Sequence, residues 1–243
     1  IDGAPVRIGG MAKGAGMIAP KLVPPRNEAT MLAYVTTDAA VDQDFLESCL
    51  YGALDGSFNR ITVDGDMSTN DTCLLLANGA AGNGILTREH PSAPAFAAAV
   101  QSVLGRLARE IVLDGEGVTR FVELCVTGAA DDAEARRCAE AIANSALCKT
   151  AWFGADPNWG RVLAAAGYAG VAVAPDRTSL DYEGVPIVRN GADAGTPEAE
   201  QSRAIDRREF CIDLDLGVGD GTFTIWTCDF TYEYVKINAE YHT

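Results

Sequence analysis

A threonine that follows an alanine is the first group in this sequence that could act as a nucleophile. Thr30 stands in Ala29-Thr30-Met31-Leu32, where a Pro- and Gly-rich segment meets an apolar, strand-like run. By composition alone it is unremarkable. If the Ala29–Thr30 bond were cut, Thr30 would carry a free α-amine that titrates near ~8 and could accept the proton of its own hydroxyl. This chemistry suits a sequence with 2 histidines and no recognisable Ser-His-Asp pattern.

Two further charged residues are candidates for a binding site, and each has a plainer interpretation. Lys13, in M-A-K-G-A-G-M-I, is isolated from other charges, so it is either a substrate anchor or a solvated lysine. Glu116 lies between two glycines, so it is either a carboxylate presented into a cleft or a surface turn residue. The segment 156–161 resembles the start of a helix, and its Trp159 suits a core as well as a functional site.

The loop D-G-D-M-S-T-N-D at 64–71 invites a calcium site, but its spacing rejects one. Counted from Asp64, an EF-hand loop needs Gly where Thr69 stands and Glu where Leu75 stands. The loop is therefore either a structured turn or part of the lining of a site. The 7 cysteines never form C-x-x-C, so we expect buried free thiols in a reducing compartment and no metal site.

Alternating strand-like and helix-like runs must position these residues. Apolar runs predict strands over 31–37, 61–63, 72–77 and 120–127, and 3.6-residue periodicity predicts helices over 39–53, 92–113 and 131–149. Two hairpins are expected, 180–182 with 185–188 and 210–216 with 223–228, and 229–240 suits either a helix or a strand. Strands mixed with helices without strict βαβ alternation predict an α+β fold with layered packing.

Charge and length exclude several classes of function. The chain has 243 residues, 48% of them hydrophobic, which is enough for a sizeable core. Its formal net charge of -15 repels phosphate backbones and anionic lipid, so no nucleic-acid or membrane partner is expected. No apolar run approaches the ~20 residues that span a bilayer. Because the chain begins at Ile1 rather than Met, we expect it to be a piece of a longer product.

Eight motifs, in order over nearly the whole chain, resemble those of the ornithine acetyltransferase family, the glutamate N-acetyltransferases of arginine biosynthesis. In chain order they are G-M-A-K-G-A-G-M-I-A-P (10–20), A-T-M-L (29–32), T-T-D-A (36–39), D-G-D-M-S-T-N-D (64–71), G-E-G-V-T-R (115–120), K-T-A-W-F-G-A-D-P-N-W-G-R (149–161), D-L-G-V-G-D-G (215–221) and Y-E-Y-V-K-I-N-A-E-Y-H-T (232–243). Several of these motifs are long and specific.

The resemblance implies a precursor that cuts itself between Ala29 and Thr30. Residues 1–29 would then be the tail of an α chain, and 30–243 would be a β chain that begins with the nucleophile Thr30. In the family, the threonine takes the acetyl group of N2-acetylornithine and passes it to glutamate in a ping-pong scheme. The implied fold is a layered α/β sandwich, assembled as an α2β2 heterotetramer.

The resemblance also implies which residues bind substrate. By motif position Lys13, Thr30, Glu116, Asn238 and Thr243 fall on the family's substrate-binding positions. We expect Glu116 and the Thr243 carboxylate to receive the substrate amine, and Lys13 and Asn238 to receive its carboxylate. A Thr-Gly pair in the upstream α chain would supply the oxyanion hole. No cofactor is implied, although bifunctional members also use acetyl-CoA as a donor.

This sequence departs from the family pattern at one place. The family has only a couple of residues between the Pro of G-M-I-x-P and the Ala-Thr bond, whereas here 21–28 intervene. These residues either loop out, are an engineered linker, or displace the bond and block cleavage. The alternatives to acetyl transfer are an aminopeptidase or amidase with the same nucleophile on the same architecture, or, if cleavage is disabled, a non-catalytic amino-acid-binding subunit. The expected compartment is the bacterial cytoplasm, with the mitochondrial matrix as the alternative.

Overall fold

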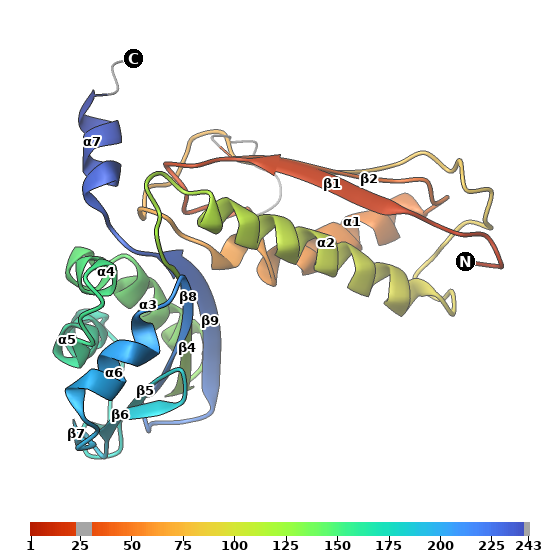
Figure 1. The fold of residues 1–243 in the computed structure, drawn as a ribbon. Helices are drawn as coiled ribbons and strands as arrows, with labels where there is room; N and C mark the ends of the chain where they lie inside the picture. Colours follow the sequence, from red (N-terminus) through yellow and green to blue (C-terminus); the bar gives the residue numbers. More distant parts are fainter. Residues whose placement is uncertain (23–30, 241–243) are drawn as a thin grey trace. The chain divides into compact units, whose positions relative to one another are not determined.

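Two compact units make up the chain, Ile1–Asp114 and Gly115–Thr243. The computed structural model describes residues 1–22 and 31–240. In each unit, helices cover one face of a sheet, which confirms the expected α+β class with layered packing (Figure 1). The predicted chain boundary at Ala29–Thr30 lies outside the described residues and stays a prediction.

The first unit is a three-stranded sheet under two helices. Its elements are β1 (Ile8–Lys13), β2 (Leu32–Thr37), α1 (Gln43–Asp55), a short 3-10 helix η1 (Phe58–Arg60), β3 (Thr72–Ala77) and α2 (Ala93–Leu113). The strand order is β1-β2-β3, with β1 antiparallel and β3 parallel to β2. A parallel pair needs a long crossover, and α1 lies within it.

The two faces of this sheet differ in what covers them. One face packs against α1 and α2 through fully buried side chains such as Ala33 and Val35. The other face carries Met11, Tyr34 and Leu74, which stand in register on β1, β2 and β3. These three side chains are 70%, 40% and 41% exposed. An apolar row of this kind on an open face is typical of a surface that meets another protein segment.

The second unit is a six-stranded sheet with the order β7-β6-β5-β8-β4-β9. Its strands are β4 (Phe121–Ala129), β5 (Ser179–Tyr182), β6 (Val185–Arg189), β7 (Ala192–Asp193), β8 (Glu209–Asp215) and β9 (Gly221–Cys228). Its helices are α3 (Asp132–Ala143), α4 (Ala146–Phe153), α5 (Trp159–Tyr168), α6 (Glu198–Ile205) and α7 (Tyr232–Glu240). The helices α3 to α6 cover one face and enclose a single core with the inward residues of the strands (Figure 1).

The predicted hairpin of 210–216 with 223–228 is wrong. Both segments are strands, but β4 lies between them, parallel to β8 and antiparallel to β9. The connection wraps around the end of β4, where Val218 N and Gly219 N both donate to the carbonyl of Gly128. Gly128 has φ +66, and a Cβ there would overlap Asp215. Alternation identifies a strand, but it does not say which strand will be its neighbour.

Most other predicted elements are confirmed, with local exceptions. The hairpin of β5 and β6 forms around Glu183 and Gly184, which both have positive φ. The segment 229–240 contains the helix α7. The single helix predicted over 131–149 is two helices, because Ser145 accepts from Cys148 N and caps a new one. Residues 61–63 are buried but belong to none of the named strands.

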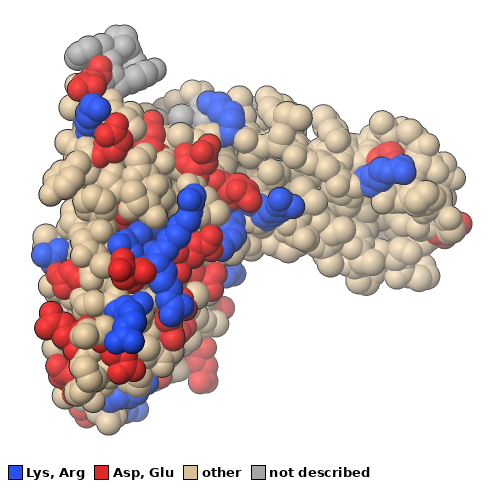
Figure 2. Space-filling model, in the orientation of Figure 1, with Lys and Arg blue, Asp and Glu red and all other residues tan. Residues whose placement is uncertain are grey.

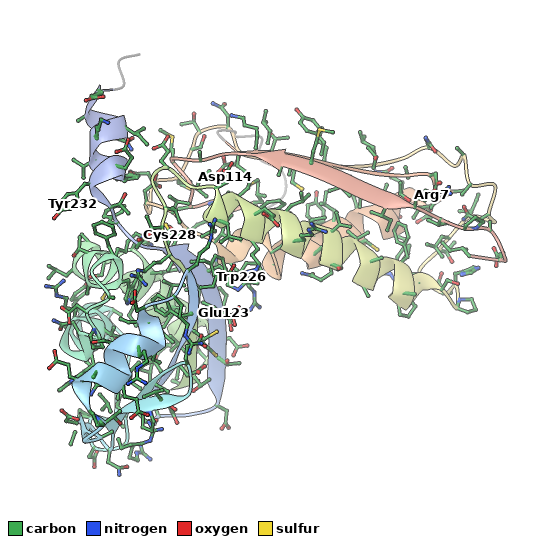
Figure 3. All side chains as sticks on the ribbon, viewed as in Figure 1. Arg7, Asp114, Glu123, Trp226, Cys228 and Tyr232 are labelled. Carbon is green, nitrogen blue, oxygen red and sulfur yellow. The ribbon has the colours of Figure 1, made fainter. Side chains whose placement is uncertain are left out.

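Acidic side chains gather on the open face of the six-stranded sheet. Glu123 on β4, Asp181 on β5 and Asp213 on β8 alternate with residues that point into the core. Glu123 accepts a hydrogen bond of 2.8 Å from the indole of Trp226 on β9 (Figure 3). Figure 2 shows charged residues gathered over this unit, whereas the visible face of the first unit is largely uncharged. Among the described residues, no helix is long and apolar enough to cross a membrane.

We predict that Leu124→Ala destabilises the second unit by about 3 kcal/mol, since a fully buried leucine on a central strand is replaced by a cavity. All 3 tryptophans (152, 159 and 226) lie in this unit, so urea unfolding followed by tryptophan fluorescence reports it alone. Leu147→Ala is the control, because Leu147 is 63% exposed. Equal midpoints for the two variants would contradict this account of the core.

A second prediction concerns pH. Desolvation raises the pKa of the Asp213 carboxyl above its ordinary value, and Asp181, Glu123 and Glu183 add to the rise. The folded state therefore holds this proton more tightly than the unfolded state, and stability is lost as pH rises through the raised pKa. Asp213→Asn should be more stable than the wild type at pH 7, and the difference should shrink as pH falls toward about 4. Urea titrations at several pH values measure it.

The control for the pH prediction is Asp220→Asn, which removes an exposed carboxylate in the loop between β8 and β9. If both variants changed stability equally with pH, the effect would come from net charge and not from the sheet face.

Candidate functional site

Lys13 ends β1 and pairs with Leu32 at the start of β2. Thr30 is two residues upstream of Leu32 in the chain, and Ala29 and Thr30 lie outside the described residues. The side chain of Lys13 is exposed, and it has no ion-pair partner in the part of the chain that the structure describes. An ammonium on β1 beside β2, the strand that follows Thr30 in the chain, suits the predicted role of a substrate anchor.

The loop 64–71 is a structured turn that also holds the backbone near Thr30. Asp71 is 4% exposed and accepts a hydrogen bond of 2.7 Å from the backbone N–H of Met31. Asp64 accepts from the N–H groups of Met17 and Ile18. Both of the proposed alternatives, a turn and a site-lining loop, are therefore compatible with the contacts of this one segment.

Glu116 projects from a tight turn that follows α2. The turn is closed by the N–H of Val118, which donates to the carbonyl of Gly115 at 3.1 Å. Gly117 has φ +68, and a Cβ on it would lie 2.7 Å from Tyr234 N, so only glycine suits this position. The turn is fixed further by Asp229, a buried carboxylate that accepts from the N–H groups of Thr119 and Arg120 at 3.0 Å each.

The helix α7 is anchored on this turn. The hydroxyl of Thr231 donates to the carbonyl of Gly117 at 2.8 Å and accepts from Tyr234 N at 3.2 Å. One turn further along the helix, Asn238 Nδ2 donates to Glu116 Oε2 at 2.8 Å. Two predicted site residues that are 122 positions apart in sequence are thus in direct contact. Thr243, which is also a predicted substrate-binding residue, lies outside the described residues.

Lys149 supports the base of α7 and was missed by sequence reasoning. Its side chain is 1% exposed, and its ammonium donates to Thr227 Oγ1 at 2.9 Å and to the carbonyl of Cys228 at 2.5 Å. The same ammonium lies 5.3 Å from the centre of the Phe230 ring, which stacks on Tyr234 of α7 at 4.6 Å. The only sequence signal was a lysine on the apolar face of a helix.

The segment 156–161 has a structural role. Asn158 caps α5 by accepting from Arg161 N, and Arg161 reaches back to the carbonyl of Leu147 in α4 at 2.8 Å. Trp159 packs against the core. A cavity of about 400 Å³ opens beside this segment, with Asp193 and Glu198 also in its lining, but it contains none of the predicted site residues.

None of the cysteines is among the predicted site residues. All 7 cysteines are free, and burial raises the pKa of Cys73 and of Cys138 to about 12. At neutral pH such thiols stay protonated and unreactive. Within residues 1–22 and 31–240, no group of His, Cys, Asp and Glu side chains could hold a metal ion.

We predict that Thr231→Val loosens α7 without unfolding the second unit. The change leaves the Gly117 carbonyl and the Tyr234 N–H without their shared partner, which costs about 1–3 kcal/mol. Because α7 has no buried residues of its own, that cost should fall on the helix alone. Hydrogen exchange of the α7 amides should speed up by about 10-fold or more. Thr222→Val, an exposed site on β9, is the control, and unchanged α7 exchange in Thr231→Val would refute the anchor.

Comparison with known proteins finds one family that matches the whole chain. The sequence model of the ArgJ family matches residues 1–243. The arginine biosynthesis bifunctional protein ArgJ of Geobacter sulfurreducens is 53% identical over 237 residues, which are 97% of this chain and 59% of that protein. A mitochondrial protein of the same name from Schizosaccharomyces pombe is 44% identical and is covered over 55% of its length.

A solved structure is also similar. The crystal structure of the arginine biosynthesis bifunctional protein argJ from Bacillus halodurans superposes with a TM-score of 0.80 at 42% identity, over 85% of this chain and 97% of that one. This chain spans about 59% of the length of the Geobacter protein. With a family model matched from end to end and relatives near half identity, the chain belongs to the ArgJ family.

Proposed function

We propose that this chain is the catalytic portion of a glutamate N-acetyltransferase that moves an acetyl group from N2-acetylornithine to glutamate. The observation that carries the proposal is the match of all 243 residues to the ArgJ family. The chain spans less than two thirds of its relatives, so the activity is proposed for the complete protein and not for residues 1–243 alone.

Self-cleavage would create the nucleophile. The Thr30 hydroxyl attacks the carbonyl carbon of Ala29, the C–N bond of Ala29–Thr30 breaks, and the nitrogen leaves as the α-amine of Thr30. Water then hydrolyses the resulting ester, which frees the hydroxyl and leaves Ala29 as a carboxylate. The new amine titrates near ~8, so at neutral or slightly alkaline pH it can take the hydroxyl proton in the next reaction.

Acetyl transfer would follow in two halves. Thr30 Oγ attacks the acetyl carbon of N2-acetylornithine, and the departing ornithine nitrogen takes up a proton. The acetyl-Thr30 ester is then attacked by the amine of glutamate, and the threonine hydroxyl is restored. Splitting one transfer through an ester replaces a difficult step with two easier ones. The negative oxygen of each tetrahedral intermediate needs hydrogen-bond donors, which we assign to a Thr-Gly pair of the upstream chain.

The charges of the predicted substrate-binding residues suit amino-acid substrates. Both substrates carry an α-carboxylate, and Lys13 offers an ammonium without an ion-pair partner among the described residues. The incoming amine of glutamate needs a negative or neutral acceptor, and Glu116, oriented by Asn238, offers one. Thr243 would add its terminal carboxylate. Acetyl-CoA as a second donor is proposed on the strength of the relatives' description as bifunctional.

A protein partner is part of the proposal. The open row Met11, Tyr34 and Leu74 is an apolar surface that the missing part of the precursor would cover. We propose that this part is the upstream α chain and that the assembly is an α2β2 heterotetramer. The relatives include bacterial proteins and a fungal protein described as mitochondrial, and for this chain we propose the bacterial cytoplasm, with the mitochondrial matrix as the alternative.

The deciding experiment expresses the complete precursor as wild type, as Thr30→Ala and as Thr36→Ala, and measures intact mass. The wild type and Thr36→Ala, whose threonine is exposed on β2, should yield a fragment that begins at Thr30. Thr30→Ala should stay uncut, because it lacks the hydroxyl. The cut protein should then convert acetylornithine and glutamate into ornithine and acetylglutamate, and Thr30→Ala should lose at least about 1,000-fold in rate.

Other results would favour other functions. Release of acetate without acetylglutamate would indicate a hydrolase with the same nucleophile. A precursor that stays uncut yet still binds glutamate would indicate a binding subunit, and it would mean that 21–28 block cleavage. Deleting 21–28 from that uncut precursor should then restore the cut.

A further inference from the structure

In the first unit, the backbone N–H and the carbonyl of Met31 are both hydrogen-bonded, to the neighbouring residues Asp71 and Thr72. The Met31 N–H donates to Asp71 Oδ1 at 2.7 Å, and the Met31 carbonyl accepts from Thr72 N at 2.9 Å. The side chain of Met31 is fully buried and Asp71 is 4% exposed, so this contact is shielded from water. The nitrogen that Asp71 holds belongs to the peptide bond between Thr30 and Met31.

The same loop and η1 hold the other flank of the segment that contains Thr30. Asp64 accepts from Met17 N at 2.7 Å and from Ile18 N at 3.0 Å. Asn59 accepts from Leu22 N at 2.8 Å and donates to the Leu22 carbonyl at 3.1 Å. These are side chains bonded to backbone, a pattern that fixes the path of a chain without depending on the identity of the residues held.

We propose that Asp71 is a positioning residue for the nucleophile: by accepting the N–H of the Thr30–Met31 peptide, it fixes the orientation of Thr30 for both self-cleavage and acetyl transfer. The inference rests on the proposed function and adds to it a residue outside the five predicted substrate-binding positions. Asp71 acts through Met31 and not on the substrate.

The size of the effect follows from how steeply these reactions depend on geometry. A reacting atom displaced by ~1 Å can lose about 100-fold in rate. The hydrogen bond from the Met31 N–H to Asp71 is shielded from water, and burial strengthens a hydrogen bond. Asp71 would therefore set the orientation of a peptide plane that contains the Cα of the nucleophile, so that a rotation of this plane would move the hydroxyl.

Two substitutions separate geometry from charge. Asp71→Asn keeps an acceptor oxygen at the same distance along the side chain and removes the charge. Asp71→Glu keeps the charge and moves the acceptor by one methylene. Asp66→Ala is the matched control, since it removes an exposed carboxylate from the same loop. All are made in the complete precursor, with folding checked by circular dichroism and with cleavage rate, kcat and KM for both substrates measured.

We expect Asp71→Glu to slow both cleavage and kcat by at least about 10-fold, with KM changed by less than about 3-fold. Asp71→Asn should stay within about 3-fold of the wild type in both, with an unshifted pH profile, and Asp66→Ala should be unchanged. A purely structural role would predict loss of folded protein in Asp71→Glu, with normal kcat for whatever stays folded.

Three results would overturn the inference. Wild-type rates in folded Asp71→Glu would show that the contact between Asp71 and Met31 does not control the orientation of the nucleophile. Asp71→Asn as slow as Asp71→Glu, or with a shifted pH profile, would show that charge and not position matters. A raised KM at normal kcat would place Asp71 on the substrate. If the wild-type precursor itself neither cuts nor transfers acetyl, the proposed function fails and this inference fails with it.

Discussion

The parallel pairing of β2 with β3 is the constraint on which the first unit depends. Its register sets Leu32 opposite Thr72, so the residues just before each strand, Met31 and Asp71, are brought level with one another. The antiparallel pairing of β1 on the other side of β2 sets Lys13 opposite Leu32. One strand thus gathers an ammonium, a buried carboxylate and the peptide next to Thr30 at one end of a sheet.

The second unit holds in place a helix, α7, that has no buried face. None of the residues of α7 is buried, so its position depends on polar and aromatic contacts at its first turn. Thr231 ties it to Gly117, and the stack of Phe230 on Tyr234 rests on the ammonium of Lys149. These contacts explain why a long buried side chain and a glycine with positive φ are needed near a surface helix.

Local pattern in the sequence predicted most elements, because periodicity reports which face of a segment is buried. The strand 72–77 has the predicted bounds, and the predicted helix 92–113 begins one residue later, at Ala93. The same pattern did not predict which strands pair with one another, since β8 and β9 are neighbours in sequence but not in the sheet. The strand β1 was missed because Gly9 and Gly10 have no side chains to form an alternating pattern.

The residues of the candidate site were likewise predicted only in part. Motif positions identified Glu116 and Asn238, and the structure joins them by a hydrogen bond. Asp71, Thr231 and Lys149 were not predicted, because each acts by bonding to backbone atoms far away in sequence, and no spacing rule encodes such contacts.

The place of the proposed cut has a consequence for how the protein can fold. The strands β1 and β2 make 6 register pairs, and the Ala29–Thr30 bond lies on the only stretch of chain between them. Before a cut, the connection keeps β1 at a high effective concentration beside β2; after it, only pairing and packing hold β1 in place. Folding would then have to precede cleavage. Refolding of the cut protein from denaturant would be a bimolecular reaction, slow at low concentration, so the mature enzyme would persist mainly because it unfolds slowly.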